Sequence, residues 1–96
     1  MADVRQTTTF RDWHRNLRDR RAAARIASRI ERLGGDNPGD VKSIGEGVSE
    51  MRIDHGPGYR VYFTRRGHTI YVLLCGGDKS TQARDIKTAK QMAKEI

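Results

Sequence analysis

Apolar and polar residues alternate along residues 48–63, on either side of a Gly56-Pro57-Gly58 turn. Strict alternation around such a turn predicts a β-hairpin. One face of the hairpin is then apolar, with Met51, Ile53, Tyr59, Val61 and Phe63. The opposite face carries Glu50, Arg52, Arg60 and Tyr62. We therefore expect an apolar side that packs on helices and a cationic side that can hold a polyanion.

Two helices are predicted in the first third of the chain. Apolar residues three and four positions apart indicate the first one, namely Phe10, Trp13 and Leu17. A capping box of Thr9 with Asp12 marks its start. Asp19 caps the second helix, which ends at the glycine pair 34–35. Its apolar side lies opposite a row of arginines, Arg21, Arg25, Arg29 and Arg32. We expect these two helices to form a helical hairpin.

The rest of the chain reads as further strands and a final helix. Short strands are expected at residues 4–7 and 41–46. A third, at residues 69–75, is apolar at nearly every position, as in a strand covered on both faces. Gly76 and Gly77 are expected to break it, and Ser80 or Thr81 caps a last helix that runs to about Glu95. The sequence thus predicts an α+β fold with a helical hairpin on a twisted antiparallel sheet of about four strands and a C-terminal helix, in one domain of residues 1–96.

The charge of the chain narrows the class of partner. Lys and Arg number 19 against 12 Asp and Glu, which gives a formal net charge of +7 over 96 residues. The guanidinium group of Arg is planar, permanently charged and suited to phosphate. A surface of this kind points to nucleic acid or to an acidic protein, and the alternative is a solvated basic surface that serves solubility.

Several classes of protein are disfavoured. Cys75 is the only cysteine, so an internal disulfide is impossible, and its apolar neighbours indicate a buried strand thiol. The N-terminal residues lack the apolar region of a signal peptide, and no apolar run approaches the roughly 20 residues that span a bilayer. His14, His55 and His68 are scattered, so we expect no metal and no cofactor. A cytoplasmic protein without membrane partners is expected.

The polar face of the hairpin offers groups suited to RNA cleavage. Attack of a 2′-hydroxyl on its own phosphate needs a base, cations that stabilise the charge on phosphate, and an acid for the leaving oxygen. Arg52 and Arg60 share one face and are candidates for phosphate binding. Glu50, on the same face, is a candidate base or an ion-pair partner of an arginine. His55, at the bend, is a candidate for proton transfer or an exposed turn residue.

A second polar cluster follows the last predicted strand, over residues 76–85. Lys79 and Gln82 stand near a helix N-terminus, where free N–H groups favour an anion. With Arg84 they are candidates for phosphate contact. An ordinary capped helix start explains the same residues, and the spacing of a P-loop is missing.

Residues 48–63 and 73–86 resemble the HigB-like "addiction module killer protein" branch of the RelE/ParE toxins. The specific segments are Gly-Pro-Gly-Tyr-Arg and Gly-Gly-Asp-Lys-Ser-Thr-Gln, and the resemblance covers nearly the whole chain. It implies a RelE/ParE-like fold and the toxin of a bacterial type II toxin–antitoxin system. RelE-like members of this group cleave mRNA in the ribosomal A site without a metal, which inhibits translation.

The resemblance also implies site residues and partners. Arg52 and Arg60 match the strand-borne basic residues of the family, and Lys79 matches its cation after the last strand. Several nucleases of the family place a Tyr or His near the chain end. This chain has none, so Asp85, Gln82 or His55 would have to take that role. The implied partners are the ribosome, mRNA and a HigA-like DNA-binding antitoxin, through which alone operator DNA is contacted.

Two other functions stay open at this stage. A ParE-type toxin poisons DNA gyrase on the same fold and cleaves no RNA. A toxin relic that only binds its antitoxin and DNA would fit the missing Tyr or His. The convergence of Arg52, Arg60 and Lys79 on one edge favours a ribosome-dependent mRNA endoribonuclease.

Overall fold

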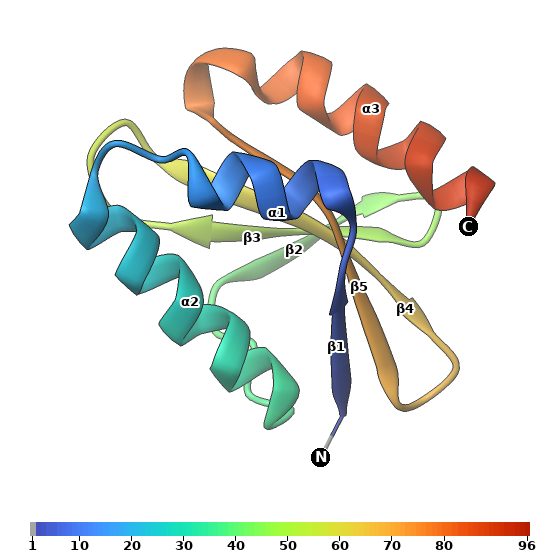
Figure 1. Ribbon diagram of the computed structural model, residues 1–96. Coiled ribbons are helices and arrows are strands. Elements are labelled where there is room, and N and C mark those ends of the chain that lie inside the picture. The colour runs from blue at the N-terminus through green and yellow to red at the C-terminus, as the bar shows by residue number, and fades with distance from the viewer. Residues whose placement is uncertain (1) are drawn as a thin grey trace.

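The computed structural model describes residues 2–96 and confirms the predicted α+β class (Figure 1). Strands and helices follow the expected order along the chain. They are β1 (Asp3–Gln6), α1 (Thr8–Arg15), α2 (Arg20–Gly34), β2 (Val41–Gly45), β3 (Val48–Ile53), β4 (Tyr59–Arg66), β5 (Ile70–Asp78), the single 3-10 turn η1 (Lys79–Thr81) and α3 (Gln82–Glu95).

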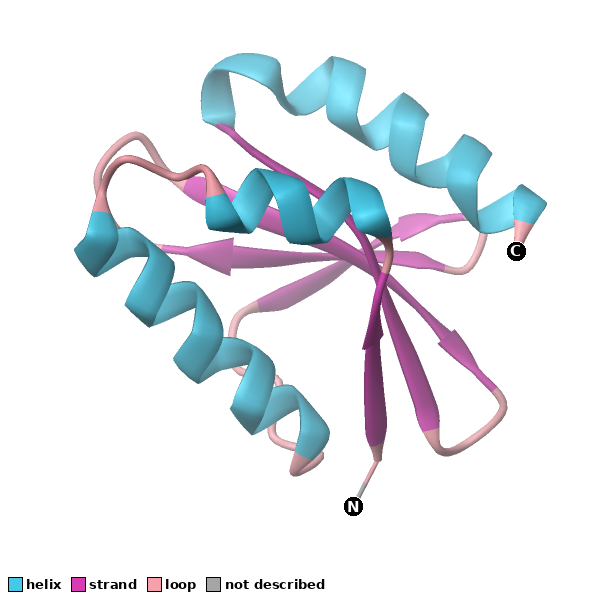
Figure 2. Ribbon diagram, viewed as in Figure 1, coloured by secondary structure: helices cyan, strands magenta, loops and turns pink. Residues whose placement is uncertain are grey.

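The described strands form one mixed sheet in the order β1-β5-β4-β3-β2 (Figure 2). Neighbours are antiparallel, except that β1 runs parallel to β5. The prediction of about four antiparallel strands therefore falls one strand short and misses the parallel pair. The reason is that β1 is only four residues long, and its direction follows from which edge of the sheet remains open once the hairpins have formed.

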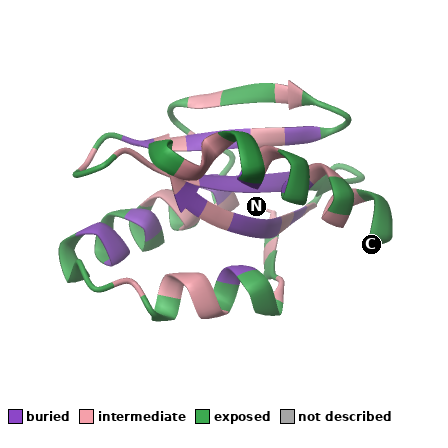
Figure 3. Cartoon of the chain, turned by 90° about the horizontal axis from the view of Figure 1, so that it is seen from above, coloured by how far each residue is buried: buried purple, intermediate pink, exposed green. Residues whose placement is uncertain are grey.

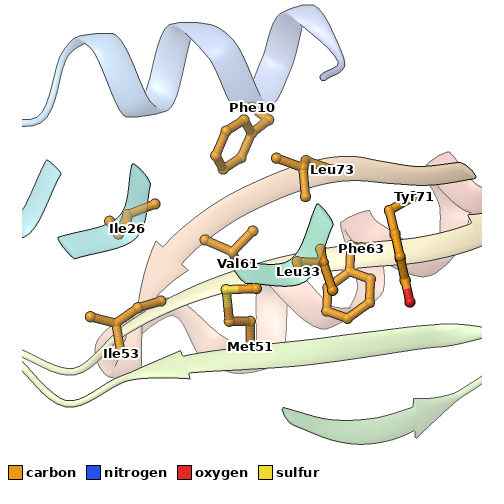
Figure 4. Close-up of a cluster of buried hydrophobic side chains, with 9 residues drawn as sticks. All are labelled: Phe10, Ile26, Leu33, Met51, Ile53, Val61, Phe63, Tyr71 and Leu73. Carbon is orange, nitrogen blue, oxygen red and sulfur yellow. The ribbon is translucent and has the colours of Figure 1, made fainter. Parts of the chain in front are cut away.

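Helices cover both faces of the sheet. Helices α1 and α2 lie on one face and α3 on the other, so the central strands are buried on both sides (Figures 1 and 3). The core under α1 and α2 joins both helices to three strands (Figure 4). It consists of Phe10, Ile26, Leu33, Met51, Ile53, Val61, Phe63, Tyr71 and Leu73. The smaller core under α3 consists of Val48, Tyr62, Leu74, Cys75 and Ala89.

The two N-terminal helices differ in detail from the predicted helical hairpin. They pack on the sheet and do not run alongside each other (Figure 1). The first helix starts earlier than predicted, because Thr7 and not Thr9 caps it: the Thr7 hydroxyl accepts a hydrogen bond from the Phe10 N–H at 3.0 Å. The predicted cap of α2 is confirmed, since the Asp19 carboxylate accepts from the N–H groups of Arg21 and Ala22. Such a cap stabilises a helix by about 1 kcal/mol.

The hairpin of β3 and β4 has the predicted apolar face but a different polar face. Met51 pairs with Val61 in register, and both are fully buried against α1 and α2. On the other face α3 covers Tyr62, and Glu50 is only 2% exposed. The expectation of a cationic side along the whole hairpin is therefore wrong, because a C-terminal helix needs an apolar surface to pack on. Of the four residues predicted for that face, Arg52 and Arg60 stay partly accessible.

Strand β5 continues through Gly76 and Gly77 to Asp78, so the predicted break at the glycine pair is wrong. A bulge at Leu74 shifts the register, which turns Gly76 toward α1 and Gly77 toward α3. A Cβ on Gly76 would come within 2.7 Å of Trp13 Cδ2 and nearer still to two other ring atoms. On Gly77 it would overlap the Asp85 carboxylate. The glycines serve close packing of two helices on one strand.

Burial of two ionisable groups predicts a loss of stability at high pH. Burial raises the pKa of the Cys75 thiol from 9.0 to about 12, and burial followed by the Glu50 charge raises the pKa of the Tyr62 hydroxyl above its ordinary 10.0. Both groups are neutral in the fold, whereas the unfolded chain loses their protons from about pH 9 and pH 10. The contribution of these two groups to the free energy of unfolding is therefore fully present below about pH 9 and falls as pH rises above it, by on the order of a few kcal/mol.

Urea unfolding followed by circular dichroism at pH 7, 9 and 10.5 measures this dependence. Cys75→Ala removes one of the two groups and is expected to flatten the decline above pH 9, whatever its effect at pH 7. A decline as steep as that of the wild type would contradict the assignment.

Candidate active site

Two arginines face each other at the turn end of the β3–β4 hairpin. Arg52 and Arg60 are a directly opposed cross-strand pair on the side of the sheet that carries Glu50. Like charges in such a pair repel each other. Glu50 offsets the repulsion, because its Oε1 lies 3.4 Å from Arg52 Nε and its Oε2 3.7 Å from Arg60 Nε. One buried carboxylate thus holds both guanidinium groups.

Glu50 is fixed from a second direction by α3. The Gln82 side-chain amide donates a hydrogen bond to Glu50 Oε2 at 2.9 Å. Tyr62 stands opposite Glu50 in register, and its hydroxyl is buried without a hydrogen-bond partner among residues 2–96. Because Glu50 is buried and engaged by two cations and an amide, its ion-pair role agrees with the structure, and it orients the arginines from beneath.

A cleft of about 260 Å³ opens above these groups. Its walls are Asp40, Arg52, Ile53, Asp54, Gly58 and Arg60. The Arg60 side chain is 13% exposed and donates from Nη1 to the Gly58 carbonyl at 2.6 Å, whereas the Arg52 side chain is 39% exposed. The Arg60 side chain is thus held in the wall of the cleft, whereas the more exposed Arg52 side chain can reach a ligand. The volume of the cleft lies just below the range of about 300–1,000 Å³ that is typical of small-molecule pockets, so the cleft has room for a phosphodiester.

A third arginine supports this cleft from the α2 side. Arg29 donates to the carbonyls of Arg52 at 2.6 Å, Pro38 at 3.0 Å and Asp40 at 3.2 Å. The Arg52 N–H in turn donates to the Asp40 carbonyl at 3.0 Å. Burial lowers the pKa of Arg29. The sequence pattern places Arg29 in the row of arginines opposite the apolar side of the helix. The one indication in the sequence that Arg29 is partly buried is its position next to the apolar Ile30.

The segment after β5 brings a lysine to the mouth of the cleft. Lys79 is exposed, and its Cβ lies beside Gly58, 3.8 Å from where a Cβ on that glycine would stand. Asp78 shapes the turn, because its carboxylate accepts hydrogen bonds from the Ser80 N–H and hydroxyl, which lower the pKa of Asp78. Thr81 is the N-cap residue of α3, as predicted, but its side chain makes no capping hydrogen bond. Its hydroxyl donates to the Asp85 carboxylate, and Asp78 caps the preceding turn η1.

The structure separates two of the predicted residues from this group. Arg84 is 75% exposed on the first turn of α3, with its Nε 3.6 Å from Asp85 Oδ1. The His55 ring nitrogen Nε2 lies 3.0 Å from Asp19 Oδ2, at the start of α2. The structure thus brings together Arg52, Arg60, Lys79 and Gln82, whereas His55 contacts the N-cap residue of α2. A proton-transfer role for His55 stays a prediction.

Neither a membrane-spanning helix nor a metal-binding cluster is found in residues 2–96. No helix in this range is both long and apolar enough to cross a membrane. Within the same range, His, Cys, Asp and Glu side chains form no group of three or more that could hold a metal ion.

Comparison with known proteins places this chain in a family. A protein of Haemophilus influenzae (strain ATCC 51907 / DSM 11121 / KW20 / Rd), which bears the name "Uncharacterized protein", is 50% identical over 93 residues. The match covers 97% of this chain and 94% of that protein. The model of the family described as "Phage derived protein Gp49-like (DUF891)" matches residues 10–95. Its members are of the toxin–antitoxin, addiction-module type, so the resemblance seen in the sequence is confirmed at that level. The chain therefore belongs to the Gp49-like family of phage-derived proteins.

Proposed function

We propose that this protein is the toxin of a type II toxin–antitoxin system and acts as a ribosome-dependent, metal-independent mRNA endoribonuclease of the HigB-like branch of RelE/ParE toxins. It inhibits translation until a cognate HigA-like antitoxin neutralises it. The observation that supports this most directly is the pair Arg52 and Arg60, which both lie beside buried Glu50 and line a cleft with room for a phosphodiester. Family membership supports the toxin and its antitoxin partner.

The proposed reaction uses the arginines on the charge that develops at phosphorus. The 2′-oxygen of the RNA bonds to phosphorus and loses its proton to a base, while the bond to the 5′-oxygen breaks and that oxygen takes up a proton. Negative charge grows on the two non-bridging oxygens, where Arg52 and Arg60 donate hydrogen bonds. Because Glu50 and the Gly58 carbonyl already orient them, little rearrangement is needed during the reaction. Lys79 stabilises the leaving side of the scissile bond or the next phosphate.

Dependence on the ribosome is supported by the lack of aromatic rings in the cleft, as far as residues 2–96 show. RNA-binding proteins commonly hold unpaired bases by stacking them on aromatic rings. Here Trp13 packs against Phe10 and Tyr59, with ring centroids 5.8 Å and 6.3 Å apart, and Tyr62 is fully buried. Among residues 2–96, no aromatic side chain lines the cleft. A site that binds phosphate but reads no base suits an mRNA that another particle presents in position.

Primer extension on mRNA from cells induced to express the protein tests the proposal. In-frame cuts within translated regions are expected, and they should vanish in the double variant Arg52→Ala/Arg60→Ala. A matched variant, Arg5→Ala/Lys87→Ala, removes two exposed charges elsewhere and should cleave normally. Intact mRNA alongside growth arrest would refute the nuclease. A DNA-supercoiling assay would then test the alternative, a ParE-type inhibition of gyrase.

His55 is proposed as the proton-transfer residue, and its environment gives a sharp test. Removal of a general acid or base typically costs about 10²–10⁴-fold in rate, so His55→Ala should slow cleavage by at least about 10²-fold. Asp19→Asn keeps the imidazole but replaces its carboxylate partner, and should cost much less. Small effects of equal size in both variants would contradict proton transfer by His55. Its role would then be structural, as a contact between the hairpin turn and α2.

A further inference from the structure

The arginine row of α2, defined as Arg21, Arg25, Arg29 and Arg32, is a second concentration of positive charge. Its members follow one another at spacings of four, four and three residues, which places them along one side of the helix. Arg21, Arg25 and Arg32 are exposed. None of these three forms an ion pair with a carboxylate anywhere in residues 2–96. Unpaired like charges at these spacings destabilise a helix slightly, so the row is a cost to the free protein.

The row opens directly onto the candidate active site. A hollow of about 290 Å³ lies between α2 and the end of β3, lined by Arg25, Ser28, Arg29, Ile53 and Asp54. Ile53 and Asp54 also line the cleft of Arg52 and Arg60, so the two hollows share a wall. Together they carry four arginines against two aspartates, Asp40 and Asp54. Figure 1 shows the start of α2 and the end of β3 side by side.

We propose that the row binds the sugar–phosphate backbone of an RNA strand that extends from the cleft. The inference rests on the proposed nuclease function, because it takes the cleft to hold a phosphodiester of RNA. Arg21, Arg25 and Arg32 contact phosphates along that strand. Arg29 is engaged by three backbone carbonyls and anchors the wall between the two hollows. From Arg21 to Arg32 the helix rises about 16 Å, which matches the rise of about four or five stacked nucleotides.

The chemistry of the row favours RNA over an acidic protein. Protein interfaces centre on buried aromatic or aliphatic anchors surrounded by a polar rim. Among the described residues the one large hydrophobic side chain that is exposed is Ile96, at the far end of α3. The solvent side of α2 offers only alanines and a serine between its charged residues: Ala24, Ala27 and Ser28. A row of guanidinium groups without an apolar anchor suits a repeating anion.

The test compares two triple variants that remove the same charge. The row variant is Arg21→Gln/Arg25→Gln/Arg32→Gln, and the matched control is Arg5→Gln/Arg11→Gln/Lys87→Gln, three exposed positions on β1, α1 and α3. Fluorescence anisotropy with a labelled single-stranded RNA of about 20 nucleotides, over a range of KCl concentrations, measures affinity and salt dependence. The row variant should bind at least about 10-fold more weakly, with a slope of log K against log salt shallower by about 2, which corresponds to three lost phosphate contacts. The control should lose far less.

Two results in this assay would overturn the proposal. One is a row variant with the affinity and salt slope of the wild type. The other is a control variant that loses as much, which would mean that only net charge matters. Polyglutamate is the probe for an acidic protein: loss of polyglutamate binding by the row variant with unchanged RNA binding would assign the row to a protein partner and refute the inference.

A second arm separates this inference from the proposed function. With ribosomes programmed by mRNA, the row variant should raise KM with little change in kcat, whereas Arg52→Ala/Arg60→Ala should lower kcat. If the protein cleaves no RNA but its RNA binding depends on the row, the nuclease function is refuted and the RNA-binding role of the row is supported. If the row variant cleaves with the KM of the wild type, RNA binding by the row is refuted and the nuclease function is not affected.

Discussion

Arg60→Ala is expected to reduce the cleavage of ribosome-bound mRNA by about 10²–10³-fold, the usual cost of removing one preorganised donor to a developing oxyanion. Arg60 is the more rigid of the two arginines, because it contacts both Glu50 and the Gly58 carbonyl and is only 13% exposed. Its guanidinium group is therefore aimed into the cleft before any ligand arrives. Single-turnover cleavage of mRNA on programmed ribosomes measures the effect.

Two further variants show whether the loss belongs to the site. Arg60→Lys keeps the charge but loses the planar fork, and should recover only part of the rate. Arg65→Ala removes an exposed arginine from the same strand, one that lies over the Tyr71 ring at 5.2 Å, and should cleave normally. Thermal unfolding must show that Arg60→Ala remains folded, since Glu50 keeps Arg52 and Gln82 as partners. A folded Arg60→Ala protein that cleaves at the wild-type rate would refute the proposed site.

Gly76→Ala is expected to destabilise the protein by about 3 kcal/mol, at the upper end of the cost of overpacking a core. The new methyl group would stand under the Trp13 ring, which itself packs against Phe10 and Tyr59. The ring can move aside only if those contacts are disturbed, and this would also disturb the packing of α1 on β5. Urea unfolding followed by tryptophan fluorescence and circular dichroism measures the change.

Gly35→Ala is the matched control. Gly35 is the C-cap of α2 at φ −87°, and the nearest atom to a new Cβ would be the Arg32 carbonyl at 3.5 Å. Alanine fits there without strain and should change stability by less than about 1 kcal/mol, in the stabilising direction. The double variant Trp13→Ala/Gly76→Ala should lose much less than the sum of its two single variants, because the collision is gone. Additive losses would show that Gly76 matters for another reason.

The sequence alone determined the hairpin and what its end presents. Alternation on both sides of the Gly56-Pro57-Gly58 turn is a local signal, and the side-chain period of two assigns each residue to a face. That is sufficient to place Arg52 and Arg60 on one face and Met51 on the face that packs on helices, as the structure has them. The Asp19 cap and the buried Cys75 were likewise predictable, because each follows from immediate neighbours along the chain.

The tertiary structure decided which polar groups surround those arginines. Glu50 receives Gln82 from a helix 32 positions away, and Arg29 reaches the Arg52 carbonyl from 23 positions away. The bulge at Leu74 and the parallel pairing of β1 arise in the same way. No local sequence pattern predicts such contacts, because they depend on how α2 and α3 pack against the sheet. The sequence therefore determined where the positive charge lies, and packing decided which arginines are free to bind and which hold the backbone in place.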